Sequence, residues 1–310
     1  MVPLAYVRQF ATNQQIDLDV ADQEIVLHYM LGLLAEAGLM GKLPGQEPGA
    51  LLFKGGTALR KCVFGQTGRF SQDIDVDAMH ENGFEALIEN MLLERSPYYG
   101  ITFTIPGFRY TESGNFSGSI AYRHASGDGA FELQISYRLE PILDPTTLTL
   151  AEQTYFQHVE FPPPALYGLD PIEMIAEKIM ACNRRRGGSA KDVYDLFLWS
   201  RHPFNHDLVR RVTVLKAWTD PRTAPRYEPN SFLETVRPAN YRWEDLDGLV
   251  PRHLDANRNA ICENVRTRFG FLSDCTAEEQ IILGDQSYKR ERRLFEELKA
   301  EAQEWSEGLF

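Results

Sequence analysis

The chain has 310 residues, of which 43% are hydrophobic and 25% are charged, and its formal net charge is -12. This composition is that of a globular protein, and the length suits one large domain or two ordinary ones. No apolar run reaches the roughly 18 residues of a membrane span. The net negative charge excludes binding of nucleic acid through overall charge, so any such contact needs a local basic patch.

The N-terminal residues and the cysteines both indicate where in the cell the protein is found. The N-terminal residues lack the basic flank and the apolar core of a signal peptide. The four cysteines are far apart and show no Cys-x-x-Cys spacing, so neither a structural zinc site nor a disulfide framework is expected. We therefore predict a cytoplasmic protein that does not associate with a membrane.

The first half of the chain predicts helices alternating with strands, from the spacing of its apolar residues and its glycine-rich turns. The expected elements in chain order are a helix at 25–39, a strand at 51–53, a helix at 57–64, a strand at 74–78, a helix at 84–93, and strands at 101–105, 116–122 and 131–137. Together they predict a small mixed sheet with flanking helices, which is an α+β architecture.

The second half begins after the proline-rich segment at 161–165, which is the strongest boundary signal. Beyond it the pattern predicts helices at 171–185, 190–200 and 286–305, with an irregular stretch at 219–251. The predicted organisation is an N-terminal domain of residues 1–162 with a mixed β-sheet, followed by a mainly helical region of residues 163–310.

The predicted strand at 74–78 carries alternating carboxylates. Asp73, Asp75 and Asp77 share one face of an extended chain, while Ile74 and Val76 share the other. Carboxylates held close together repel unless a cation lies between them. Because Mg²⁺ binds one or two carboxylates with phosphate oxygens and water, Asp73 and Asp75 are candidate ligands for Mg²⁺ or Mn²⁺.

The glycine pair before this strand is a candidate phosphate site. Gly55 and Gly56 let backbone amides approach a phosphate closely, and Thr57 is expected to cap the helix that follows. Lys54 and Arg69 are further candidate phosphate partners. Each motif has a simpler interpretation: a Gly-Gly pair is usually only a turn, and an Asp-x-Asp is often a solvated edge strand.

Two rival motifs are weaker. A calcium loop starting at Asp73 would need glycine at its sixth position and glutamate at its twelfth. The chain has Ala78 and Phe84 there, which excludes it. An aspartyl phosphatase nucleophile would normally end an apolar strand; the sequence Arg-Phe-Ser-Gln at 69–72 before Asp73 argues against this alternative without excluding it.

At these two motifs the chain resembles the AbiEii/AbiGii-type nucleotidyltransferase toxins, which include the MenT-like enzymes of the polymerase-β-like nucleotidyltransferase superfamily. The resemblance rests on Lys-Gly-Gly-Thr-Ala-Leu at 54–59 and Arg-Phe-Ser-Gln-Asp-Ile-Asp at 69–75. It implies a nucleotidyltransferase-type fold for residues 1–162, a helical domain that completes the active-site cleft, and a metal-dependent enzyme.

A third segment extends the resemblance to about residue 200. It consists of Ala-Glu-Lys at 176–178 and Lys-Asp-Val-Tyr-Asp-Leu at 191–196, with lysine where the family usually has arginine. By the resemblance, Lys178 would bind nucleotide phosphate and Asp192 would position Lys178 or the attacking hydroxyl. The alternatives are that Asp192 completes a capping box with Ser189, and that Lys178 is a snorkelling surface residue.

The chain departs from the superfamily in one respect. Many members carry a third carboxylate on a later strand, and the position aligned here holds Gln134; Glu132 lies on the same strand face and is a candidate substitute. In some family members a serine at the position of Ser71 resembles a phosphorylation site that silences the enzyme. A phosphate on Ser71 would add negative charge beside the carboxylates.

Three basic segments are candidates for contact with RNA: 184–186 with Lys191, 210–211, and 289–293, of which the last two are expected to be solvated surface. The resemblance implies transfer of a nucleoside monophosphate from NTP to an RNA acceptor, with the tRNA 3′ end favoured, and a cognate antitoxin. The alternatives are nucleotidylation of a protein or small molecule, which the acidic composition favours, and an inactive relative that binds a partner.

Overall fold

The structure, a computed structural model, describes residues 1–41, 51–79, 83–110, 115–137, 141–184, 188–220, 226–254 and 257–307. The chain folds into two compact units. The first contains Met1–Arg138, Pro145–Gly168 and Gly248–Leu254, and the second contains Leu139–Asp144, Leu169–Asp247 and Asp255–Phe310. The proline-rich segment that predicted a boundary lies inside the first unit, within Pro145–Gly168.

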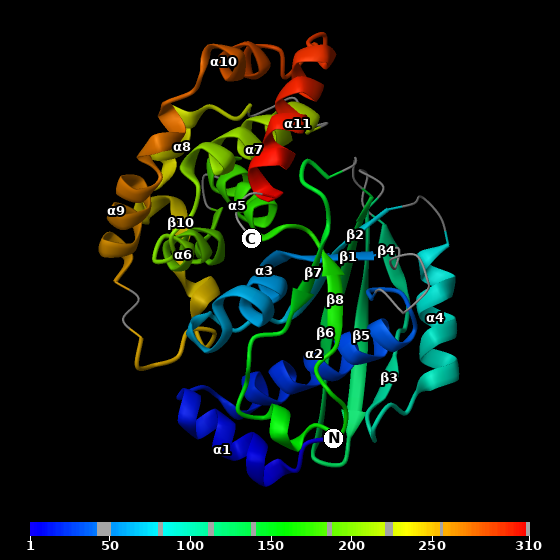
Figure 1. The fold of residues 1–310 in the computed structure, drawn as a ribbon. Coiled ribbons are helices and arrows are strands. Elements are labelled where there is room, and N and C mark those ends of the chain that lie inside the picture. Colours follow the sequence, from blue (N-terminus) through cyan, green and yellow to red (C-terminus); the bar gives the residue numbers. More distant parts are fainter. Residues whose placement is uncertain are drawn as a thin grey trace. The chain divides into compact units, whose positions relative to one another are not determined.

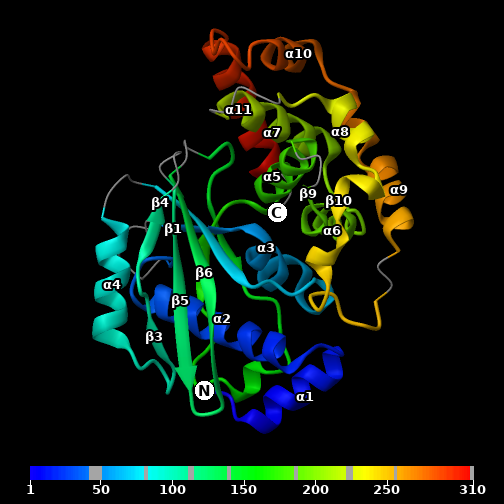
Figure 2. The ribbon, with the colours of Figure 1, turned by 180° about the vertical axis from the view of Figure 1, so that it is seen from behind.

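The first unit is built on a mixed sheet, which confirms the predicted α+β class. Among the described residues the strands follow the order β3-β5-β6-β2-β1-β8-β7, with β4 also paired to β5 (Figures 1 and 2). The strands are β1 (Leu51–Lys54), β2 (Asp73–Ala78), β3 (Thr102–Thr104), β4 (Phe108–Tyr110), β5 (Phe116–His124), β6 (Gly127–Tyr137), β7 (Thr146–Thr149) and β8 (Ala165–Gly168).

The helices of this unit are α1 (Leu4–Gln14), α2 (Leu18–Glu36), α3 (Gly55–Ala58) and α4 (Phe84–Arg95), with a π-helical segment η1 (Leu59–Phe64) and short 3-10 turns η2 (Gly65–Thr67) and η3 (Phe156–His158). α2 runs across the sheet (Figure 1), and its segment from Glu24 to Ala35 is apolar around most of the helix and buried at every position. The helix predicted at 57–64 is thus split into α3 and η1, and α2 begins seven residues before the predicted start at Ile25.

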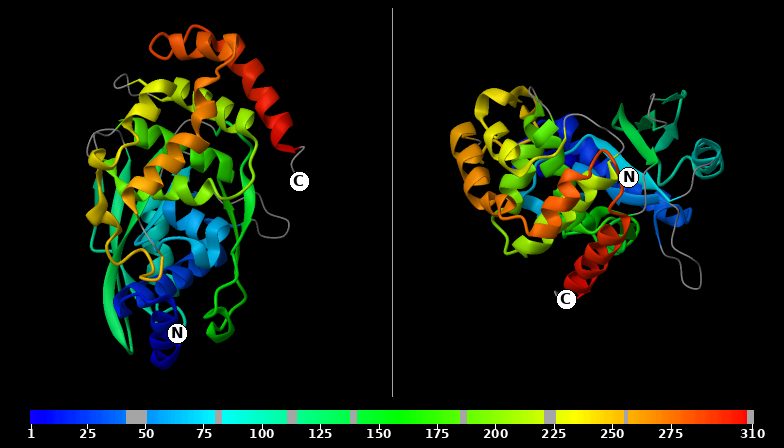
Figure 3. Two further views of the ribbon diagram at one scale, coloured as in Figure 1. Left: turned by 90° about the vertical axis from the view of Figure 1, so that its left-hand side faces the viewer. Right: turned by 90° about the horizontal axis from the view of Figure 1, so that it is seen from above.

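The second unit is helical, as predicted for the C-terminal region. Its elements are α5 (Pro171–Arg184), α6 (Ala190–Trp199), α7 (His206–Thr219), α8 (Pro229–Thr235), α9 (Arg258–Arg268), α10 (Ala277–Gly284), α11 (Arg292–Glu307), the 3-10 turns η4 (Pro238–Asn240), η5 (Trp243–Leu246) and η6 (Gly270–Ser273), and a parallel pair of short strands, β9 (Gly188–Ser189) and β10 (Tyr241–Arg242). Figure 3 shows these helices from two further sides, with α11 in red.

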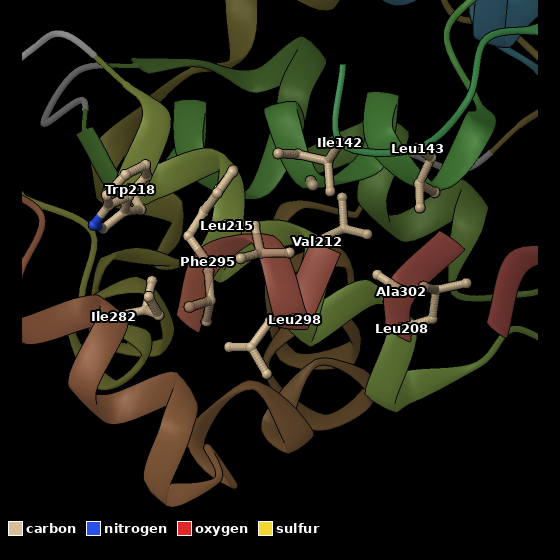
Figure 4. Packing of buried hydrophobic residues seen from close by; sticks show 12 residues of the cluster. Ile142, Leu143, Leu208, Val212, Leu215, Trp218, Ile282, Phe295, Leu298 and Ala302 are labelled. Carbon is tan, nitrogen blue, oxygen red and sulfur yellow. The ribbon is translucent and has the colours of Figure 1, made fainter. Parts of the chain in front are cut away.

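The core of the second unit forms where α7 meets α11 and α10. Leu208, Val212 and Leu215 recur at four- and three-residue spacing along α7, so they share one face of the helix. This face packs on the apolar face of α11, and Trp218 stacks on Phe295 with ring centroids 4.5 Å apart (Figure 4).

The basic pair at 210–211 lies beside this core and was wrongly predicted to be solvated surface. Arg210 Nε and Arg211 Nε each donate to one carboxylate oxygen of Glu279, at 2.8 Å in both cases. Glu279 is fully buried, and the two guanidinium groups are nearly so. A buried carboxylate needs such charge-assisted partners, so these arginines join α7 to α10 and do not form an RNA-binding patch.

Among the described residues, no helix combines the length and the apolarity that crossing a membrane requires.

Unfolding of the protein should depend on pH through His28 of α2. Its ring stacks on Phe161 at 5.3 Å between centroids, and neither ring nitrogen has a hydrogen-bond partner in the described part of the chain. Burial, helped by Lys61, lowers the pKa of His28 from 6.5 to about 3. The unfolded chain therefore binds one more proton between these pH values, and the free energy of unfolding falls as pH falls, by up to about 1.4 kcal/mol per pH unit.

His28→Phe should keep the ring stack and remove this dependence. Denaturant unfolding at about pH 7 and about pH 5 should show a smaller loss of stability in the variant than in the wild type. The exposed His202, changed to glutamine, is the control for loss of an imidazole. Equal losses in wild type and His28→Phe would contradict the assignment.

Candidate active site

The sequence-predicted residues of the first unit meet at the pairing of β1 with β2. These strands are antiparallel, and Lys54 lies opposite Asp75. The chain turns directly after Lys54, so Gly55 begins α3 next to the Asp75 side chain. Gly55 has φ +77°, and a Cβ atom there would overlap the Asp75 carboxylate. The glycine is therefore required twice, by the left-handed backbone and by the close approach of the carboxylate.

The predicted face of the acidic strand is confirmed. Ile74 and Val76 are fully buried, whereas Asp73 and Asp75 keep partial exposure to solvent. Asp77 differs from these two acids because it is buried and forms an ion pair with Lys54. The ammonium of Lys54, a predicted phosphate partner, is thus engaged inside the strand pair, and Asp73 and Asp75 are the acids of β2 with access to a ligand.

Thr57 has another role than the predicted helix cap. Lys54 occupies the N-cap position of α3, and no side chain caps this helix. The Thr57 hydroxyl instead donates to the backbone carbonyl of Asp73. The prediction that Thr57 caps α3 was therefore wrong; the fully buried hydroxyl ties α3 to the start of the acidic strand and so helps to set the position of Asp73.

Arg69 and Ser71 complete the surroundings of the glycine turn. A Cβ atom at Gly56 would meet the guanidinium of Arg69 at 2.5 Å and the Ser71 hydroxyl at 3.4 Å. Arg69 is 3% exposed, so its positive charge lies directly beneath the first turn of α3. The Ser71 hydroxyl donates to Asp73 Oδ1 at 2.8 Å. The predicted residues of this unit therefore surround one turn of backbone.

The neighbouring strand β6 shows where a third acid would lie. β2 and β6 are parallel, with Asp73 beside Glu132 and Asp75 beside Gln134. Paired residues of adjacent strands share a face, so both candidates lie on the acidic face, as predicted. Across the described part of the chain, no three His, Cys, Asp or Glu side chains are grouped closely enough to hold a metal ion; the role of Glu132 stays a prediction.

The residues predicted in the second unit also meet. Lys178 Nζ donates to Asp192 Oδ1 at 2.8 Å and lies 3.0 Å from Asp195 Oδ2. The side chain of Lys178 is 13% exposed, so it is not a snorkelling surface residue. Ser189 caps α6 by accepting from the Lys191 backbone amide, and Asp192 holds Lys178, so the interpretation of Asp192 as only a helix cap was also wrong.

Sequence reasoning missed Asp195. It lies in the quoted segment at 191–196, three residues after Asp192, and that spacing places two side chains on the same face of a helix. The residues at 185–187 and the side chain of Arg184 lie outside the described residues, so the basic segment predicted there is not placed. Of the third basic segment, Arg290, Arg292 and Arg293 are exposed.

The family model described as "Nucleotidyl transferase AbiEii toxin, Type IV TA system" matches residues 44–267. The chain belongs to this family. The AbiEii match spans both the glycine turn with its acidic strand and the Lys178 cluster. The protein is accordingly a nucleotidyltransferase and a toxin of the type IV toxin–antitoxin class.

The fold of one solved toxin agrees with membership of the AbiEii family. MenT4, a nucleotidyltransferase toxin from Mycobacterium tuberculosis H37Rv, superposes with a TM-score of 0.78 at 25% identity, covering 98% of this chain and 100% of MenT4. A putative nucleotidyltransferase from Helicobacter pylori gives a TM-score of 0.48 at 17% identity, covering 84% of this chain and 96% of its own. JHP933, also from Helicobacter pylori, gives a TM-score of 0.46 at 18% identity, covering 92% of this chain and 98% of its own. No curated protein sequence gives a significant match.

Gly55→Ala should reduce nucleotidyl transfer by about 100-fold, because displacing a reacting group by about 1 Å costs this much. The added methyl group must push the Asp75 carboxylate out of place. Gly83→Ala is the matched control: Gly83 has φ +80° and an added Cβ would meet nothing within 4 Å. Both variants bear the backbone strain, of about 1 kcal/mol, so equal transfer rates in the two would refute the steric role of Gly55.

Lys54→Met should lower the free energy of unfolding by about 3–5 kcal/mol, because it leaves the buried Asp77 carboxylate without its counterion. The double variant Lys54→Met/Asp77→Leu should recover most of this loss, since neither charge is then buried. Chemical denaturation measures both. A double variant as unstable as the single one would show that the ion pair is not the main role of Lys54.

Proposed function

We propose that this AbiEii-family protein transfers a nucleoside monophosphate from NTP to a hydroxyl group of RNA, with the tRNA 3′ end as acceptor. The acceptor oxygen forms a bond to the α-phosphorus, the bond between the α-phosphorus and the bridging oxygen breaks, and pyrophosphate leaves. The observation that supports the proposal is the close approach of Gly55 to Asp75, which brings the glycine turn proposed to bind phosphate next to a carboxylate of the acidic strand.

The donor set on β2 fits a divalent cation. Asp73 and Asp75 are two partly exposed carboxylates on one face of the strand, and the backbone of Gly55 lies directly against the Asp75 carboxylate. Mg²⁺ or Mn²⁺ with two carboxylates would take its other ligands from phosphate and water. When bound, such an ion would neutralise the negative charge that develops on the triphosphate.

The remaining residues bind and orient. The backbone amides at Gly55 and Gly56 and the guanidinium of Arg69 are proposed to bind the triphosphate, because they combine a turn that is partly exposed at Gly55 with a fixed positive charge beneath it. Thr57 and Ser71 hold Asp73 in place. Lys178 is proposed to bind a phosphate oxygen, and Asp192 to orient Lys178. A cognate antitoxin is proposed as the partner that controls the enzyme.

Asp75→Asn should lower transfer by about 1,000-fold, the upper range for loss of one preorganised electrostatic group. The amide keeps the shape of the side chain, so the unfolding temperature should change little. Asp128→Asn is the control, because Asp128 is an exposed acid on β6 of the same sheet. A large loss of stability in Asp75→Asn alone would mean that the acid is structural.

The acceptor is tested with α-labelled NTP, Mg²⁺ and separate pools of tRNA and total protein. We expect label on tRNA, and no label on tRNA whose 3′ ribose was opened by periodate, because that treatment destroys the acceptor hydroxyl. Label on periodate-treated tRNA would place transfer elsewhere on the molecule. Label on protein alone would refute the RNA acceptor and support the alternative that the net charge of -12 favours.

A further inference from the structure

Lys178 of the second unit lies between two carboxylates that differ in exposure. The side chain of Asp192 is 15% exposed, close to the 13% of Lys178, whereas that of Asp195 is 1% exposed. Asp192 and Lys178 can therefore reach a ligand, and Asp195 cannot. A carboxylate sealed from water is costly unless it is paired, so Asp195 and Lys178 require each other.

We propose that Asp195 is a positioning residue that holds the Lys178 ammonium in place and keeps it protonated. This inference rests on the proposed function, in which Lys178 contacts a phosphate of NTP. When the Lys178 ammonium binds a phosphate oxygen, it divides its hydrogen bonds between the phosphate and Asp192. Asp195 remains its counterion on the buried side. The four rotatable bonds of the lysine are thereby ordered before the ligand arrives, which lowers the entropic cost of binding.

Asp192 and Asp195 of α6 both form ion pairs with Lys178. Cys182 of α5 interacts electrostatically with Lys178, and Tyr241 of β10 interacts with Cys182 and Asp192. Burial raises the pKa of both groups well above the usual values, so they stay neutral near neutral pH. On α7, Lys216 pairs with Glu173 and Glu177. Removing the charge of Asp195 should therefore act directly on Lys178.

The first test uses Asp195→Asn, which keeps an acceptor oxygen and removes the charge. In protein labelled with ¹³C at lysine Cε and free of nucleotide, the midpoint of the Lys178 titration should move to lower pH by about one unit or more, since an opposite charge at this range favours the charged form. Lys178→Arg identifies the resonance. An unchanged midpoint would overturn the proposal.

The second measurement is kinetic. In Asp195→Asn the high-pH limb of kcat/KM should move to lower pH by the same amount, and KM for NTP should rise about tenfold with a smaller change in kcat. A wild-type protein that transfers no nucleotide, with the Lys178 titration shifted as expected, would refute the proposed function and leave the pairing of Asp195 with Lys178 intact.

Glu173→Gln is the matched control. Glu173 lies on the same helix as Lys178, its side chain is also 1% exposed, and it binds the Lys216 ammonium at 2.7 Å. Loss of this buried charge should leave the midpoint of the Lys178 titration unchanged; a shift in Glu173→Gln equal to that in Asp195→Asn would overturn the proposal.

If Asp195→Asn does not fold, Asp192→Asn is measured in its place, because Lys178 then keeps Asp195 as its buried counterion. If the Lys178 midpoint in Asp192→Asn fell by more than about one unit, the proposal would be contradicted.

Discussion

The candidate active site of the first unit depends on the register of two short strands. Because β1 and β2 are antiparallel with Lys54 opposite Asp75, the chain leaves β1 as Gly55 directly beside a carboxylate of the acidic strand. A shift of one residue would turn the side chains of β2 to the opposite face. The carboxylates would then enter the core, and the apolar residues would face the ligand.

Short polar contacts hold this register. The Thr57 hydroxyl binds the Asp73 carbonyl, Ser71 binds the Asp73 carboxylate, and Lys54 pairs with Asp77. These contacts divide the three acids of β2 into a compensated structural one and two that keep access to solvent. The division matters chemically, since two accessible carboxylates suit a cation whose remaining ligands come from phosphate and water.

The charge balance of the Lys178 cluster in the second unit is the reverse of that in β2. In β2 one lysine neutralises the surplus acid, whereas in the Lys178 cluster two acids surround one lysine. The first arrangement leaves two carboxylates partly exposed to solvent, and the second holds a partly buried ammonium between two carboxylates. Both clusters lie within the residues that match the AbiEii family model.

Local patterns alone determined the helix and strand class of most elements, the acidic face of β2, the glycine turn and the family, because these depend on residue type and spacing within a few positions. Tertiary structure decided the partners of the buried charges. Arg210 and Arg211 look like a surface patch in the sequence but bind Glu279, which is 68 residues away from Arg211. Lys54 was expected at a phosphate and pairs with Asp77, and the pairing of Asp195 with Lys178 is visible only in the folded chain. A charged side chain carries no local signal of its counterion, since only folding brings the two together and removes the water that would otherwise solvate them.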